Sequence, residues 1–279
     1  MSWLAPIAQA WLVAVMTGIG LPLGALAILM IHKLTGGVWG NEAKPALERI
    51  ASALPLLLLC GLPLLASITL ILPFVTQPAA DLPPRVAAKL DYLQPLWIIV
   101  RTLVIAGIWL VVWRTHDRSR RAAVLGLIAY MLGLLVFTTD WMQALDPGYY
   151  STIYPVVVAG AQILGAFALV ILLIPIDVKG DFGKLLLAAL LSWAYFAAMQ
   201  WLINWMGDLP DEAEWYLRRL NGAWPVLLIL MIALFAVVPF FALLPASIRT
   251  KLPKLRIVAG IVLAGYVAES LWRMGPAHG

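Results

Sequence analysis

Long apolar runs separated by short polar links follow one another along the whole chain. A helix that crosses a membrane needs about 20 consecutive, mostly apolar residues. The pattern therefore predicts an all-α integral membrane protein with about eight transmembrane helices, and residues 1–279 form a single transmembrane domain. We expect these helices over residues 8–32, 50–76, 94–114, 121–140, 152–175, 182–206, 223–246 and 255–274.

The composition supports a membrane protein. The chain is 63% hydrophobic and 12% charged, with a mean hydropathy of +0.95, whereas a soluble domain is about 25% charged. The formal net charge of +5 therefore bears on how the links are placed, and not on nucleic-acid binding. The first apolar run lacks a basic start and an A-x-A-like cleavage site, so we interpret it as a retained helix.

The basic residues predict the orientation, because cytoplasmic links of membrane proteins are enriched in Lys and Arg. Thirteen of the nineteen Lys and Arg residues lie in the odd-numbered links, and four lie in the even-numbered links. The odd links are therefore expected in the cytoplasm and both termini on the other, outer side. Asp140 and Asp146 then lie on the outer side, in the fourth link, and the acidity of this link is partly the complement of the positive-inside rule.

Ionisable residues inside a membrane are costly and are usually functional or paired. Arg101 is the eighth residue of its predicted helix, roughly 12 Å below the outer end at 1.5 Å per residue. Asp140 closes the next helix on that side, and Glu269 lies about one turn from the outer end of the last helix. One cation and two acids could form a proton-accepting or quinol-contacting site. Alternatively, Arg101 pairs with an acid to hold two helices together, and Glu269 extends outward to water.

The sequence argues against resident haem, zinc or iron–sulfur groups. A b-type haem held by two histidines needs a facing pair within the helices, but His32 is at a helix end, His116 is in a link and His278 is in the tail. The single cysteine, Cys60, cannot supply a multi-cysteine site. We therefore expect no metal site, and no haem or iron–sulfur cluster, in this chain.

Tryptophan is abundant, with 13 residues. Most lie near predicted helix ends, where an aromatic belt is ordinary. Trp193 and Trp201 lie within one helix together with Tyr195 and Gln200. These side chains either pack neighbouring helices, which we favour, or contact a quinone ring.

Four stretches, in order along the chain, resemble one known family. The resemblance runs from about residue 8 to residue 275, and its stretches are IHKLTGGVWG (31–40), DYLQPLWIIVRTLVIAGIW (91–109), DWMQALDPGYYSTIYPVVVAGAQ (140–162) and LLSWAYFAAMQWLINWMGDLPDEAEWYLRR (190–219). They are similar to the ActF membrane subunit of alternative complex III, within the NrfD/PsrC-like superfamily of quinone-interacting membrane subunits. ActF subunits are generally longer, with about ten helices, so this chain resembles a shortened member.

The resemblance implies two packed four-helix bundles in the bacterial inner membrane, with both termini in the periplasm. It implies periplasmic multihaem cytochrome c or iron–sulfur subunits as partners, other membrane subunits of the same complex, and lipid. Quinol is the expected ligand, and an acid before the P-G-aromatic-aromatic-S-T turn helps to form its pocket. Asp140 occupies that place, and Tyr149, Tyr150 and Ser151 lie in the turn.

These observations give a ranked set of candidate residues. Those expected in proton transfer or quinol contact are Asp140, Arg101, Asp146 and Glu269, and those expected to bind quinol are Gln162, Tyr149, Tyr150 and Trp141. Those expected to shape the outer face and its partner contacts are Asp208, Glu212 and Arg218, and those of a cytoplasmic-side proton path are His32 and Glu48.

Two other functional classes remain open from the sequence. One is a purely structural membrane anchor without a quinone site, because the chain is short and has no cofactor ligands of its own. The other is a secondary transporter, which usually shows repeated, broken helices in matching positions. In this chain, prolines such as Pro22, Pro55, Pro63 and Pro225 lie within predicted helices, and they form no such repeat.

Overall fold

The computed structural model describes residues 4–174, 181–207 and 210–275. Within these ranges no residue is in a strand, and eight helices are long and apolar enough to cross a membrane. The predicted all-α, multi-span membrane fold is confirmed. The long helices are α1 (Leu4–Thr35), α2 (Val38–Ala51) continued by α3 (Leu54–Ala66), α6 (Pro95–Thr115), α7 (Arg120–Trp141), α8 (Tyr154–Leu173), α9 (Asp181–Gly207), α11 (Trp224–Ile232) continued by α12 (Val238–Leu243), and α14 (Leu252–Met274).

The second span differs from its prediction. It begins at Val38 rather than near residue 50, and its apolar part ends at Ala66. The first half, α2, is amphipathic and carries Glu42, Lys44 and Glu48. A search for apolar runs therefore does not detect it. After α3 come the short helices α4 (Ile68–Ile71) and α5 (Pro84–Ala87), which occupy part of what was predicted as helix and link.

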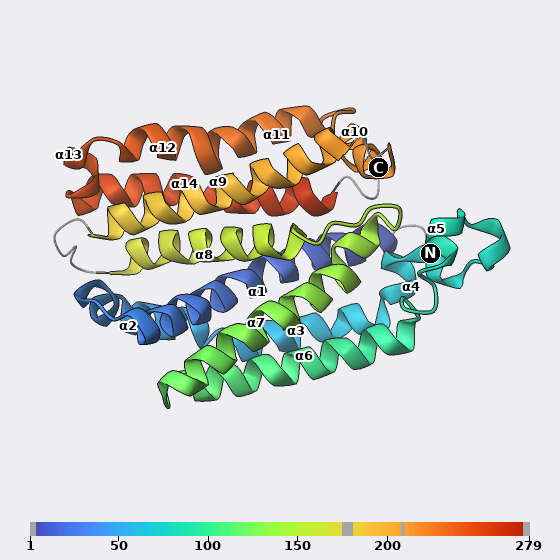
Figure 1. Cartoon of the computed structure of the whole chain (residues 1–279), viewed down its shortest axis with the longest axis horizontal. Coiled ribbons are helices and arrows are strands. Elements are labelled where there is room, and N and C mark those ends of the chain that lie inside the picture. Colours follow the sequence, from blue (N-terminus) through green and yellow to red (C-terminus); the bar gives the residue numbers. More distant parts are fainter. Residues whose placement is uncertain (1–3, 175–180, 208–209, 276–279) are drawn as a thin grey trace.

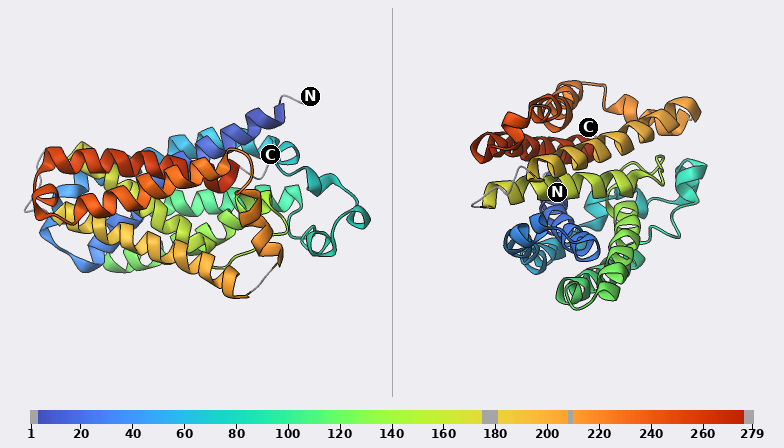
Figure 2. Two further views of the ribbon diagram at one scale, coloured as in Figure 1. Left: turned by 90° about the horizontal axis from the view of Figure 1, so that it is seen from above. Right: turned by 60° about the vertical axis from the view of Figure 1, so that its left-hand side comes forward.

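The helices lie side by side in two groups of four spans (Figure 1). One group holds α1, α2–α3, α6 and α7, and the other holds α8, α9, α11–α12 and α14. α1 begins and α14 ends at the same end of the bundle, which we call the termini end. The segment between α4 and α6 projects beyond the spans there (Figure 2), and α10 (Pro210–Arg218) also lies at this end.

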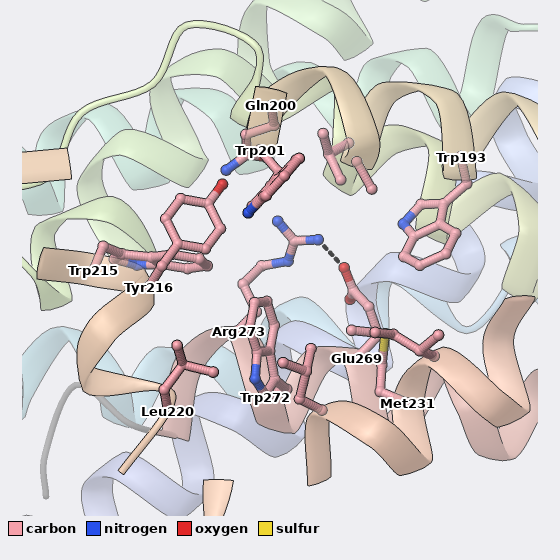
Figure 3. A pocket seen from close by; sticks show the side chains of 14 residues that line it. Trp193, Gln200, Trp201, Trp215, Tyr216, Leu220, Met231, Glu269, Trp272 and Arg273 are labelled. Atoms are coloured by element: carbon pink, nitrogen blue, oxygen red, sulfur yellow. Dashed lines mark hydrogen bonds and ion pairs between the residues drawn. The ribbon is translucent and has the colours of Figure 1, made fainter. Parts of the chain in front are cut away.

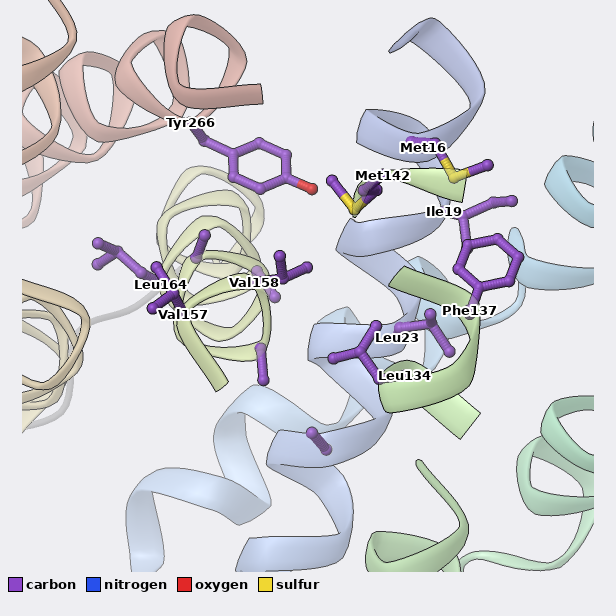
Figure 4. Close-up of a cluster of buried hydrophobic side chains, with 14 of the residues drawn as sticks. Met16, Ile19, Leu23, Leu134, Phe137, Met142, Val157, Val158, Leu164 and Tyr266 are labelled. Carbon is purple, nitrogen blue, oxygen red and sulfur yellow. The ribbon is translucent and has the colours of Figure 1, made fainter. Parts of the chain in front are cut away.

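The two groups meet where α1 packs against α8, and these are the most buried spans. Gly24 permits the close approach, because a Cβ there would lie 2.2 Å from the backbone oxygen of Gln162. Towards the termini end the interface is filled by an apolar cluster (Figure 4) that includes Met16, Phe137 and Val158. Without a difference in polarity between lipid and helix, such close packing is what joins helices in a membrane.

A π-helical segment, Ala233–Val237, joins α11 to α12 and packs closely against α14. Single π-helical turns often occur at functional sites. This one presents Phe235 to Trp193 of α9, with the rings edge to face and their centroids 4.5 Å apart. Gly265 of α14 makes the contact possible, because a Cβ there would lie 2.7 Å from the Phe235 backbone.

We expect Gly265→Ala to destabilise the protein by about 1–3 kcal/mol, because the added methyl group overpacks a contact made by backbone atoms. Thermal unfolding of the purified protein in detergent measures the change. Gly260→Ala is the matched control on the same helix, since its Cβ would meet nothing within 4 Å. Equal melting temperatures for the two variants would contradict the close packing of the π-helical segment.

Candidate functional site

The turn between α7 and α8 is held in place by buried charges. Asp146 is 4% exposed, and its two carboxylate oxygens accept from Arg218 at 2.9 Å and from Arg219 at 3.1 Å. Arg218 also binds the exposed Glu214 at 2.6 Å. The turn is thereby bonded to α10, so Asp146 has a structural role whatever else it does.

Arg219 is the central residue of this cluster and is 1% exposed. Besides Asp146 it donates to the backbone oxygens of Trp215 and Arg273, both at 2.8 Å, and of Trp272 at 3.3 Å. Its guanidinium carbon lies 3.6 Å from the centroid of the Trp215 ring. One buried cation thus joins the α7–α8 turn, α10 and the end of α14.

Asp140, the first-ranked candidate, is completely buried and forms a two-point ion pair with Arg101. Nε of Arg101 donates to one carboxylate oxygen at 2.8 Å and a terminal nitrogen to the other at 3.0 Å. Next to it, Trp141 donates to the Thr102 hydroxyl at 2.8 Å. These contacts join α7 to α6, as the helix-packing interpretation of Arg101 predicts.

Tyr92 covers this ion pair. The Arg101 guanidinium carbon lies 4.0 Å from its ring centroid, and the backbone oxygen of Tyr92 accepts from Arg101 at 2.9 Å. Burial, followed by the negative charge of Asp140 and a side-chain hydrogen bond to it, raises the pKa of Tyr92 to about 12. The phenol is therefore protonated at neutral pH and can donate to the carboxylate.

A cavity of about 380 Å³ lies beside Tyr92, and we call it the turn cavity. Its polar lining comprises Lys89, Tyr92, Thr139, Gln143, Tyr149 and Tyr150. The Lys89 ammonium donates to the backbone oxygen of Pro147 at 2.6 Å, and burial lowers the pKa of Lys89. Two of the four residues predicted to bind quinol, Tyr149 and Tyr150, thus line a cavity next to the residue that covers Asp140.

Tyr149 also lines the turn cavity. It is buried, stacks on Trp215 with ring centroids 4.9 Å apart, and its hydroxyl accepts from the Gln200 side chain. Burial raises the pKa of Tyr149. Tyr150, by contrast, is exposed, so the two adjacent tyrosines differ in environment.

Glu269 does not join Arg101. It is 3% exposed and pairs with Arg273, one turn further along α14, which is also buried (Figure 3). The structure therefore differs from the predicted cluster of one cation and two acids, and Glu269 does not extend outward to water. Each acid has its own arginine because Asp140 and Glu269 belong to different groups of helices.

Glu269 and Arg273 line a second cavity, of about 390 Å³, between α8, α9, α10, α11 and α14 (Figure 3). We call it the tryptophan pocket, because its walls include Trp193, Trp201, Trp215 and Trp272. The turn cavity and the tryptophan pocket have no lining residue in common in the described part of the chain. Both lie at the termini end.

The remaining candidates lie apart from both cavities or at their margins. Gln162 is buried on α8 and accepts from the Tyr130 hydroxyl at 2.8 Å. Glu212 of α10 is partly exposed. Asp208 lies outside the described residues.

The opposite end of the bundle carries the predicted cytoplasmic-side residues. One ring nitrogen of His32 lies 2.9 Å from the Gly37 backbone oxygen, and the ring packs against Trp39. Glu48 is 3.7 Å from Lys44, which also binds Asp117 at 2.7 Å. Hydrogen bonds from Lys44 and Lys33 lower the pKa of Asp117 to about 2. Here the contacts tie the α6–α7 link to α1 and α2.

Sequence reasoning missed both Tyr92 and Arg219. Tyr92 stands nine residues before Arg101 in a stretch that drew attention only through the family resemblance. Arg219 belongs to an Arg-Arg pair in an otherwise acidic link that was predicted to be non-cytoplasmic. Two adjacent arginines in such a link are unusual, and this was the signal that could have identified Arg219. In the described ranges, no group of three or more His, Cys, Asp or Glu side chains is placed to hold a metal ion.

Comparison of the chain with protein-family models and with curated proteins finds no match.

Proposed function

We propose that this protein is a membrane subunit of a bacterial respiratory quinol-oxidising complex in the inner membrane. It contributes to quinol binding and proton transfer at the turn cavity, on the periplasmic side. Periplasmic multihaem cytochrome c or iron–sulfur subunits, with other membrane subunits, carry the electrons. The resemblance to ActF and the NrfD/PsrC-like subunits supports this assignment, together with one feature of the site.

That feature is the position of Tyr92 between the turn cavity and Asp140. Its side chain lines the cavity, and it interacts with both members of the Arg101–Asp140 pair. A phenol that is protonated at neutral pH can accept a proton from a neighbour as it passes its own to a carboxylate. Tyr92 therefore provides a short route from the cavity to a buried acid.

Quinol oxidation requires such a route. Each quinol releases two protons and two electrons, and the protons need acceptors within hydrogen-bond reach. Tyr149, Tyr150 and Gln143 offer polar contacts for the head group, and the apolar remainder of the cavity suits its ring. The Arg101 guanidinium compensates the charge of the buried Asp140 carboxylate, which is the form that can accept a proton. Partner subunits supply the electron acceptors.

Tyr92→Phe tests the proposal, because it removes the hydroxyl and keeps the ring over Arg101. We expect quinol oxidation by the intact purified complex to fall about 100-fold, the low end of the range for loss of a proton-transfer group. The control is Tyr195→Phe on α9, whose ring is exposed on the surface of the bundle. Turnover that is the same in both variants, with every subunit retained, would favour the purely structural anchor.

A further inference from the structure

We infer that the tryptophan pocket is a second binding site, separate from the turn cavity, for a flat, uncharged, lipid-soluble ring that carries hydrogen-bond-accepting oxygens. A quinone head group belongs to this chemical class. The inference does not depend on the turn cavity, because the two cavities are lined by different residues.

The walls of the pocket suit a flat ring. Four tryptophans and Tyr216 line a space of about 390 Å³, within the range of small-molecule sites. Phe235 of the π-helical segment packs on Trp193 from behind, which holds that indole in place. Aromatic side chains favour offset or edge-to-face contact with another ring, each worth about 0.5–1.5 kcal/mol beyond the area buried.

Three unpaired donors on the lining residues indicate that the ligand carries oxygen acceptors. Nε1 of Trp193, Nε1 of Trp272 and Nε of Arg273 have no hydrogen-bond partner in the described part of the chain, and all three side chains are at least nine-tenths buried. Figure 3 shows the nitrogen of Trp193 on the edge of its ring nearer to the Glu269–Arg273 pair. A buried donor without an acceptor costs about 1–3 kcal/mol, and carbonyl oxygens of a bound ring would relieve that cost.

The charges of the pocket select an uncharged ligand. Arg273 is already neutralised by Glu269, so a phosphate or carboxylate would enter without a free cation and would meet the Glu269 carboxylate. A cation would meet Arg273 in the same way. A neutral carbonyl compound avoids both penalties, which in a buried place are several kcal/mol.

Exposed apolar side chains on the surface of the bundle line part of the pocket. Trp201, Leu220 and Ile232 line the pocket and are 51%, 53% and 43% exposed. Trp201 also stacks on Trp205 one turn further along α9, with ring centroids 5.6 Å apart. An apolar molecule dissolved in the membrane can therefore reach the pocket sideways, without crossing water.

Photoaffinity labelling of the intact complex with an azido-ubiquinone, competed with decylubiquinone, tests the site. We expect labelled peptides from residues 193–201, 215–232 and 269–273, and protection of these peptides by the competitor. Ala197→Trp places an indole in the pocket and should abolish this labelling. Leu191→Trp, on an exposed position of the same helix, should leave it unchanged.

Trp193→Phe keeps an aromatic wall and removes one donor, so it should weaken competition by decylubiquinone about fivefold, the effect of one hydrogen bond. Absence of label from the three segments in the wild type would overturn the inference. So would protection by phosphatidylglycerol vesicles and not by decylubiquinone. Labelling of residues 88–93 and 143–150 reports on the turn cavity separately, so each site can fail without the other.

Discussion

Asp140→Asn should reduce quinol oxidation by the intact complex about 100-fold, with all subunits still present. The carboxylate is the buried end of the route through Tyr92, and an amide cannot accept its proton. Loss of a positioned acid–base group typically costs 10²–10⁴-fold in rate. The measurement is turnover of the purified complex with subunit content determined in the same sample.

Asp181→Asn, at the opposite end of the bundle, is the control for removing an acid, and it should leave turnover unchanged. The Arg101–Asp140 pair also joins α6 to α7, so loss of the acid could disturb assembly. Subunit content separates the two effects. Full turnover of Asp140→Asn in a fully assembled complex would mean that Asp140 only packs helices and that the chain is a structural anchor.

Asp146→Asn should lower the free energy of unfolding by about 3 kcal/mol, because it leaves the buried cation of Arg219 without its counter-ion. The three backbone oxygens around Arg219 remain as acceptors, so we expect the lower end of the range for a broken buried pair. Thermal or denaturant unfolding in detergent measures the loss.

Glu214→Gln is the matched control for Asp146→Asn, because it removes the exposed partner of Arg218. Exposed ion pairs contribute about 0–1 kcal/mol, so this variant should unfold nearly like the wild type. An Asp146→Asn protein with unchanged stability and reduced turnover would instead place Asp146 in proton transfer.

The sequence and the structure agree best where the deciding interaction is local. A run of about 20 apolar residues is a span wherever it lies, and seven of the eight predicted spans match a helix to within five residues at each end. The Glu269–Arg273 pair is local too, since residues four apart on a helix are neighbours, but it was not predicted, because Glu269 was expected near Arg101 or in water. The predicted bounds of the second span were wrong because its first half, α2, is amphipathic. That half is a helix because it packs against α1 and α8.

The partners of the acids and the cavities required the tertiary structure. Asp140 and Arg101 are 39 residues apart, and Asp146 and Arg219 are 73 apart, so no local pattern joins them. The sequence also allowed other partners, since it predicted a cluster of Arg101 with both Asp140 and Glu269. The position of Tyr92 over Arg101 depends on how the chain turns into α6, and the lining of the tryptophan pocket comes from five helices.

The sequence by itself therefore determined that the chain is helical, that it spans a membrane many times and that its acids gather near the helix ends, because hydrophobicity and charge act on each segment separately. Only the tertiary structure decided which acid meets which arginine and where cavities remain, because those depend on how close the helices approach and on how each is rotated about its axis.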